Sequence, residues 1–166
     1  MKPLPAIAAA LALTTAAQAQ TPASAPAIAD PTVASWGVVQ TLVAEAKAQR
    51  REDQPLVSLL LAQAPGYTAR VDYRASVGPA NLHETENEIF QVLEGAATLI
   101  VGGTLVEPTA PRNGNRNGAR VDGGRARVVG AGDVLFVAAG APHWFSAVDK
   151  LVVLSIHTPP GGRPAP

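Results

Sequence analysis

Two of the three histidines in this 166-residue chain lie beside residues that could complete a metal site. His83 comes five residues before Glu88, which opens an apolar run typical of a strand. His143 follows a Gly-Ala-Pro turn at the start of another such run. Imidazole and carboxylate suit iron, manganese, nickel, zinc or copper. These three residues therefore predict a divalent transition-metal site with positions open for water or substrate.

Further polar candidates flank this set. Asn81 shares a face with His83 in an extended segment and offers an amide oxygen, a weaker and harder donor than imidazole. Glu84 and Glu86 flank the histidine, either as carboxylates that orient a ligand or act as a general base, or as a solvated acidic turn. His157 ends the last apolar run, and alternation leaves open whether it faces inward.

Apolar residues on the same faces predict a pocket around the metal. Phe90 and Val92 share the face of Glu88, Phe145 shares that of the second candidate histidine, and Tyr73 is assigned to the same pocket. Ordinary core packing predicts the same residues, so pocket wall and core remain alternatives for them.

Short strands separated by glycine-containing turns must position these side chains. One amphipathic helix is predicted over residues 35–49, with Ser35 as its N-cap, and only strands follow it. Many short strands with almost no helix between them favour an all-β antiparallel barrel or sandwich. The predicted strands cover residues 56–62, 67–75, 88–93, 97–101, 126–129, 133–137, 143–147 and 151–157.

Residues 107–124 interrupt this rhythm. The segment is rich in Pro, Asn, Gly and Arg and is longer than a hairpin needs, which predicts a long exposed loop. We interpret it as a solvent-facing flap, with a lid over the site as the alternative. Arg112, Arg116 and Arg120 suit either an anion site or a solubilising role.

Length and composition predict a single domain, which we place over residues 32–159. The balanced charge favours a small molecule as its partner. A chain of this length can bury one core of respectable size. Its 13 basic and 13 acidic residues give zero formal net charge, so nothing favours nucleic acid or anionic lipid. The sequence has no cysteine, which excludes disulfides, thiolate ligands and a cysteine nucleophile.

The first residues have the features of a secretory signal peptide. Lys2 precedes an Ala/Leu-rich run over residues 6–17, and Ala17-Gln18-Ala19 forms a small-x-small cleavage site. We expect a signal peptide over residues 1–19, a flexible leader over 20–31 and a disordered tail over 160–166, with an alanine-rich low-complexity tail as the alternative to the signal. The mature chain is expected in the periplasm without membrane insertion, since no later segment approaches about 20 apolar residues.

The spacing around the two histidines resembles the paired motifs of the cupin family. The first motif is His-x-His, three or four residues, Glu, six residues and Gly; His83, Glu88 and Gly95 match its last three positions. The second motif runs Gly, five residues, Pro-x-Gly, two residues, His, three residues and Asn; Gly140 and His143 match, as does its opening Gly132. The resemblance spans residues 56–159.

The resemblance implies a small jelly-roll barrel with a metal inside its mouth and pairing into a homodimer through an edge sheet. The chain departs from the motifs at four positions. Asn81 replaces the first histidine, which makes it an optional fourth ligand or a substrate contact; Ala75, Ala138 and Ala147 replace turn or packing residues.

The predicted site supports more than one function. The first interpretation is a metal-dependent enzyme on a small molecule, of dioxygenase, isomerase, epimerase or lyase class. The alternative is a non-catalytic barrel that holds a sugar or organic acid through the metal, and a third is a metal-free barrel that acts through its surface. The chain has no Gly-x-Ser-x-Gly, phosphate-binding loop or His-Glu-x-x-His motif that would favour another chemistry.

Overall fold

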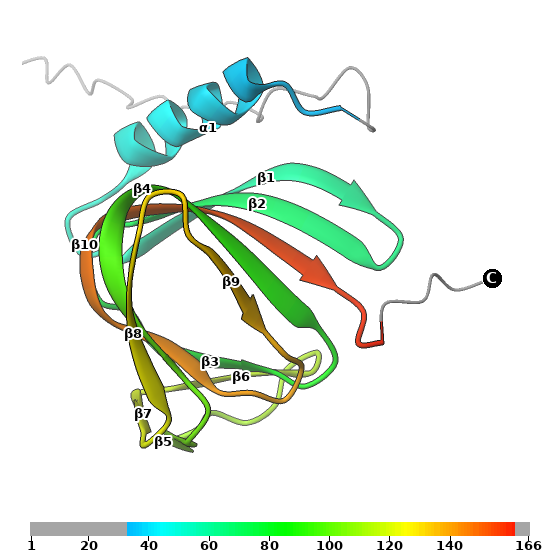
Figure 1. Ribbon diagram of the computed structural model, residues 1–166, viewed down its shortest axis with the longest axis vertical. Coiled ribbons are helices and arrows are strands. Elements are labelled where there is room, and N and C mark those ends of the chain that lie inside the picture. Colours follow the sequence, from blue (N-terminus) through cyan, green and yellow to red (C-terminus); the bar gives the residue numbers. More distant parts are fainter. Residues whose placement is uncertain (1–32, 162–166) are drawn as a thin grey trace, which may run out of the picture.

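The computed structural model describes residues 33–161, so the predicted signal peptide and leader, and most of the predicted tail, lie outside the described residues. One helix precedes a curled antiparallel sheet, which confirms the predicted all-β barrel with an N-terminal helix (Figure 1). In chain order the elements are α1 (Trp36–Gln49), β1 (Leu56–Ala64), β2 (Tyr67–Arg74), β3 (Ala80–His83), β4 (Asn87–Val101), β5 (Thr104–Val106), β6 (Asn115–Gly118), β7 (Arg120–Asp122), β8 (Arg125–Gly130), β9 (Val134–Val137) and β10 (His143–Thr158).

The helix begins where the sequence predicts. The Ser35 hydroxyl accepts a hydrogen bond from the Val38 amide at 3.4 Å and caps the first turn. Helix α1 lies across the outside of the barrel over β1 and β2 (Figure 1). Within residues 33–161, no helix is long and apolar enough to span a membrane. The buried face of the helix packs against the outer face of the sheet, in a cluster formed by Val39, Leu42, Val43, Leu61, Val71 and Val152.

Strands β4 and β10 pair along nearly their whole lengths and form the frame of the barrel. On its other edge β10 pairs with β2 and, at His143, with β3, while β4 pairs on its other edge with β8 and β9. The sequence predicts two short strands in place of each of these long ones. Strands β4 and β10 are each continuous through the position where the sequence predicts a break. Each strand bends there, and register shifts in the pairing of β4 with β10 mark the bends.

Gly95 lies at the bend of β4. Its φ is 74°, and a Cβ there would lie 2.4 Å from the Asp149 carbonyl oxygen, so only glycine fits between the two long strands. Before the bend Phe90 and Val92 face the barrel interior, and after it Ala97 and Leu99 do. The inward face therefore shifts from even to odd residue numbers at Gly95, as a bulge requires.

The segment over residues 107–124 differs from the predicted exposed loop. Strand β6 pairs with β3, and β7 pairs with β5 in a small second sheet. The β6 sequence Asn-Arg-Asn-Gly has no apolar alternation, so its pattern gives no sign of a strand. Residues 115–118 nevertheless form a strand, because their backbone groups hydrogen-bond with the backbone groups at the free edge of β3. This pairing brings β6 beside the first candidate histidine.

Candidate metal centre

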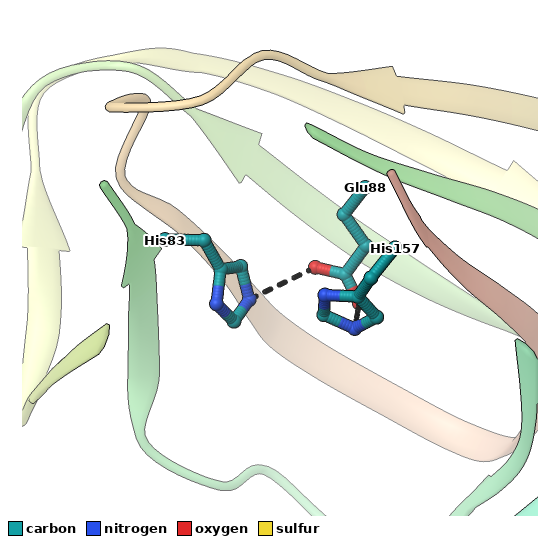
Figure 2. Close-up of side chains that lie close together, drawn as sticks. All are labelled: His83, Glu88 and His157. Atoms are coloured by element: carbon teal, nitrogen blue, oxygen red, sulfur yellow. Dashed lines mark ion pairs between the residues drawn. The ribbon is translucent and has the colours of Figure 1, made fainter. Parts of the chain in front are cut away.

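All three histidines of the chain meet at one carboxylate inside the barrel, and Figure 2 draws two of them, His83 and His157, with Glu88. His83 ends β3, Glu88 lies near the start of β4, and His143 and His157 lie at opposite ends of β10. The strand pairing sets this arrangement, since His157 lies directly opposite Glu88 across β10 and β4. The structure thus brings together three of the four predicted metal ligands and adds a histidine whose facing the sequence leaves open.

The second predicted motif positions His143 through a turn. The Ala141 amide donates to the Ala138 carbonyl at 3.1 Å, and Gly140 adopts a φ of 78°. The Gly140 amide also donates to the His83 carbonyl at 2.7 Å. The turn before β10 is therefore tied to the end of β3, and this tie fixes the two histidines relative to each other.

The distances within the cluster are short. Glu88 Oε2 lies 3.2 Å from His83 Nε2 and 3.1 Å from His143 Nε2, and Glu88 Oε1 lies 3.2 Å from His157 Nε2. Donor atoms of His83, Glu88 and His157 all lie within 4.8 Å of one another. Side chains of this kind at this spacing can share one ion.

Hydrogen bonds on the far side of two rings fix their tautomers. His83 Nδ1 donates to the amide oxygen of Asn115, its cross-strand neighbour on β6, at 2.6 Å. His143 Nδ1 donates to the Ala141 carbonyl at 3.3 Å. A carbonyl or amide oxygen only accepts, so both Nδ1 atoms carry the proton. In the neutral rings each Nε2 then presents a lone pair to the centre of the cluster, which is the form that binds a metal.

Glu88 is the centre of the arrangement and is 3% exposed. Its Oε1 accepts a hydrogen bond from the Ser155 hydroxyl at 2.7 Å, whereas its Oε2 is buried and has no hydrogen-bond partner among the described residues. Burial by itself would raise the pKa of Glu88, but the imidazoles of His143, His157 and His83 outweigh it and hold the pKa well below its usual range. The carboxylate is therefore ionised.

The pKa values of His83 and His157 shift upward, opposite to that of Glu88. Burial by itself would lower the pKa of His83 and of His157, but Glu88 beside them outweighs it and raises both pKa values. His157 Nδ1 also lies 3.3 Å from the exposed carboxylate of Glu86. A positive charge at the centre of the cluster is therefore favoured, either as protons on the rings or as a cation between them.

These residues fit a divalent transition-metal ion. A buried carboxylate oxygen without a hydrogen-bond partner costs about 1–3 kcal/mol or more, which a bound cation removes. His83, Glu88 and His157, with His143 Nε2 3.1 Å from the same carboxylate, form a nitrogen-rich donor set that suits iron, manganese, nickel, zinc or copper better than magnesium or calcium.

The structure places Asn81 beside the cluster, with its amide oxygen turned to another partner. Asn81 lies directly opposite His143 in the pairing of β3 with β10. Its Oδ1 accepts a hydrogen bond from Asn117 Nδ2 at 3.0 Å. The predicted fourth ligand is thus engaged with β6, and His157 supplies the further donor near Glu88.

A cavity of about 170 Å³ opens beside the cluster, and its lining is more polar than the sequence predicts. Phe90 and Phe145 are buried in the barrel core beneath it, where the Phe90 ring lies 6.1 Å from that of His143. Val92 belongs to the same core, and Tyr73 packs in the cluster under the helix, on the outer face of β2. The residues that line the cavity are Leu56, Ser58, Arg70, Asp72, Arg74, Asn81, His83, Glu88 and His157.

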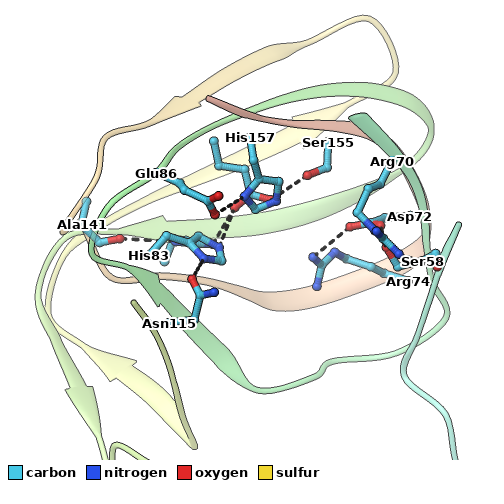
Figure 3. Close-up of polar contacts among 12 residues, drawn as sticks. Ser58, Arg70, Asp72, Arg74, His83, Glu86, Asn115, Ala141, Ser155 and His157 are labelled. Carbon is cyan, nitrogen blue, oxygen red and sulfur yellow. Dashed lines mark hydrogen bonds and ion pairs between the residues drawn. The ribbon is translucent and has the colours of Figure 1, made fainter. Parts of the chain in front are cut away.

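One group on the cavity wall has no role predicted from the sequence. Arg74, Asp72 and Arg70 share the inner face of β2, and Figure 3 shows them beside the histidine cluster. The Ser58 hydroxyl donates to Asp72 Oδ1 at 2.5 Å, and Arg74 Nη2 lies 3.5 Å from Asp72 Oδ2. Burial raises the pKa of Asp72, against the lowering by Arg74 and by the hydrogen bond from Ser58.

Two of the arginines predicted in the loop are paired with carboxylates. Arg116 lies 2.9 Å from Glu84, and Arg120 lies 2.8 Å from Asp122. The first pair joins the segment over residues 107–124 to the end of β3, whereas the second lies within β7 itself. Both pairs are exposed, so each contributes little to stability.

No protein-family model and no curated protein matches the chain. Solved structures similar to it include KdgF from a Halomonas species, with 16% identity, a TM-score of 0.48 and coverage of 66% of this chain and 85% of that one. The cupin domain of Cnp3 from Schizosaccharomyces pombe has 14% identity and a TM-score of 0.45, covering 64% and 62% of the two chains. The DMSP lyase DddQ from Ruegeria pomeroyi DSS-3 has 19% identity and a TM-score of 0.46, covering 70% and 54%.

The predicted antiparallel barrel is confirmed, and in it the histidines of both predicted motifs, His83 and His143, lie at the carboxylate of Glu88. What the site can do follows from its own side chains.

Proposed function

We propose that this chain is an exported cupin-like protein that binds a divalent transition-metal ion with His83, Glu88, His143 and His157 and uses it to act on a small molecule. One observation carries the proposal most directly. Glu88 Oε2 lies within 3.2 Å of two imidazole nitrogens, is buried, and has no hydrogen-bond partner among the described residues. Nitrogen lone pairs that face an ionised carboxylate oxygen repel it unless a cation or proton lies between them.

The bound metal would supply Lewis-acid chemistry, polarising an oxygen of the substrate or lowering the pKa of a water. The chain supplies the rest. Asn115 and the Ala141 carbonyl hold the ring orientation of two ligands, and Ser155 holds the carboxylate of Glu88. The apolar floor below the cluster keeps bulk water away from it. These features support an isomerase, lyase or dioxygenase class of reaction.

Turnover by metal-loaded protein tests the proposal. Protein stripped with a chelator and reloaded separately with Fe²⁺, Mn²⁺, Ni²⁺ or Zn²⁺ would be incubated with a panel of sugars, diketones, catechols and organic acids. Product formation and oxygen uptake would be followed, with Glu88→Gln as the inactive variant and Glu94→Gln, an exposed glutamate on the same strand, as the matched control. Turnover that needs the metal and Glu88 supports an enzyme.

Saturable binding of a panel member without turnover would favour the non-catalytic ligand-binding barrel. Absence of both metal uptake and ligand binding in the folded wild type would contradict either form of the proposal. Export is tested separately by the N-terminal sequence of the mature protein in a bacterial periplasm, where cleavage after Ala19 leaves Gln20 as the first residue.

A further inference from the structure

The cavity wall beside the metal cluster carries a buried arginine with unused hydrogen-bonding capacity. Arg74 is 8% exposed, and its Nε is buried without a hydrogen-bond partner in the part of the chain that the structure describes. Its nearest carboxylate contact, Nη2 to Asp72 Oδ2, is long at 3.5 Å. A buried guanidinium with an unpaired N–H is costly to keep. The side chain also lines the cavity, so the part of the guanidinium that faces the cavity can contact a ligand.

Its surroundings hold the Arg74 side chain in place. The guanidinium carbon lies 4.8 Å from the centre of the Phe145 ring, which supports the group from the barrel core. Asp72, held by the Ser58 hydroxyl, lies on its other side. A guanidinium fixed in this way loses little freedom when it binds an anion.

The charges of this wall favour an anion. Arg70 and Arg74 carry one positive charge each, against one negative charge on Asp72, and the bound metal would offset the negative charge of Glu88 on the same cavity. Arg70 is already engaged, since its Nε donates to the Ser58 hydroxyl at 2.7 Å and its Nη2 donates to the Ser58 carbonyl at 3.2 Å. Arg74 is therefore the arginine of the wall that remains available to a ligand.

We propose that Arg74 binds the carboxylate of a small organic acid whose second oxygen donor reaches the metal held by the histidine cluster. This inference rests on the proposed metal site and names the class of ligand that the site takes. Arg74 and the cluster residues His83, Glu88 and His157 line the same cavity, so one ligand can contact both. A planar carboxylate matches the planar fork of a guanidinium.

The dimensions of the cavity limit the ligand to a few carbon atoms. Its volume of about 170 Å³ is below the roughly 300–1,000 Å³ of pockets that hold drug-sized ligands. One carboxylate of the ligand would face Arg74 and its second oxygen donor would face the metal, so the two positive groups share the charge of the ligand. Short hydroxy acids, keto acids and dicarboxylic acids fit these limits.

Calorimetric titration of malonate into Mn²⁺-loaded protein tests the inference. Malonamide, the neutral analogue of the same size, and inorganic phosphate are titrated in parallel. Wild type is expected to bind malonate at least about tenfold more tightly than malonamide, the difference that one charge-assisted hydrogen bond typically makes. Arg74→Gln is expected to lose that preference while its Mn²⁺ content stays unchanged.

Two further variants keep the result interpretable. Arg51→Gln removes an exposed arginine outside the cavity and is expected to bind malonate as wild type does. Arg74→Lys keeps a positive charge beside Asp72, so Asp72 is not left as an unpaired buried charge and the variant is expected to fold. It is expected to retain part of the preference for malonate over malonamide. Partial retention in this variant with loss in Arg74→Gln supports the subsite.

Equal affinity of wild type for malonate and malonamide, or undiminished preference in Arg74→Gln, would overturn the inference while leaving the metal site intact. Tighter binding of phosphate than of malonate would overturn the assignment to carboxylic acids. Wild type that takes up no Mn²⁺ and shows no change with other transition metals would instead remove the proposed function, and this inference with it.

Discussion

Strand β2 has two faces that are buried to a similar degree and differ completely in chemistry. On the outer face Val71 is fully buried against α1, and on the inner face Asp72 and Arg74 are 5% and 8% exposed. Each buried apolar side chain contributes roughly 1.5–3 kcal/mol to stability, whereas a buried charge costs free energy unless it is fully paired. The outer face therefore stabilises the barrel, and the charged inner face, which lines the cavity, lowers that stability.

The two faces are expected to respond to different changes. Substitutions under the helix should lower the free energy of unfolding without altering metal affinity. Substitutions of the histidines or of Glu88 should lower metal affinity without lowering the free energy of unfolding of the metal-free protein.

Leu42→Ala is expected to lower the free energy of unfolding by about 2–5 kcal/mol, because Leu42 is 1% exposed at the centre of the cluster under the helix. Denaturant unfolding of metal-free protein measures this change. Metal affinity in the folded variant should remain within about twofold of wild type. A large loss of metal affinity would show that the two faces are coupled.

Glu88→Gln is expected to weaken metal binding by more than about 100-fold, beyond the roughly 10–100-fold that loss of a group behind a ligand costs. The substitution keeps the size of the side chain and removes the charge that faces three imidazoles. Competition with a coloured chelator measures the affinity. Glu94→Gln, at an exposed ion pair with Lys47, serves as the control, and similar losses in both variants would refute a specific role for Glu88.

Asn115→Ala is expected to weaken metal binding by about tenfold, because Asn115 fixes the tautomer and orientation of His83. The same chelator competition measures it. Asn117→Ala, two residues along β6, removes an amide that bonds Asn81 instead and should change the affinity much less. If Asn117→Ala had the larger effect, Asn81 would be the more important neighbour of the metal.

The pH dependence of stability is expected to change sign when metal binds. Without metal, the raised pKa values of His83 and His157 give stability that is complete below about pH 6.5 and is lost as pH rises through those raised values. With excess metal the rings must be deprotonated, so the stabilisation by metal grows over the same range. Thermal unfolding from about pH 6 to 8 should show shifts of about 2–8 °C in opposite directions. Parallel curves would contradict a shared site for protons and metal.

The sequence predicts the class of fold well because apolar alternation and glycine turns are local signals. It predicts α1 and the positions of most strands for the same reason. It fails to predict that β4 and β10 are continuous, since each contains a bend that shifts the inward face by one residue. In β10 these shifts lie between Phe145 and Ala147 and again near Lys150, which has a φ of 45°.

These shifts explain why the role of His157 could not be predicted. Val148 packs into the inner core although alternation from His143 would turn it outward, and a second shift restores the original face before Val153. Simple alternation across such a strand gives no dependable answer. The pairing of His157 with Glu88 depends on long-range register, which a single sequence does not contain.

The inner face of β2 departs from the prediction for a different reason. An alternating strand normally turns its apolar face to the core, so alternation assigns Tyr73 to the pocket and the charged residues to solvent. The helix covers the apolar face from outside, which leaves Arg74 and Asp72 facing the cavity. Hydrophobic patterning carries no signal that these charged residues are buried.

Metal content shows directly whether the three histidines and Glu88 bind a transition-metal ion. Elemental analysis would be made on untagged wild type purified from the periplasm and on His83→Ala and His143→Ala. Wild type is expected to contain close to one transition-metal ion per chain, and both variants are expected to lose that ion while they remain folded. Folded wild type that contains no such metal and takes up none of iron, manganese, nickel or zinc when they are added would contradict this expectation.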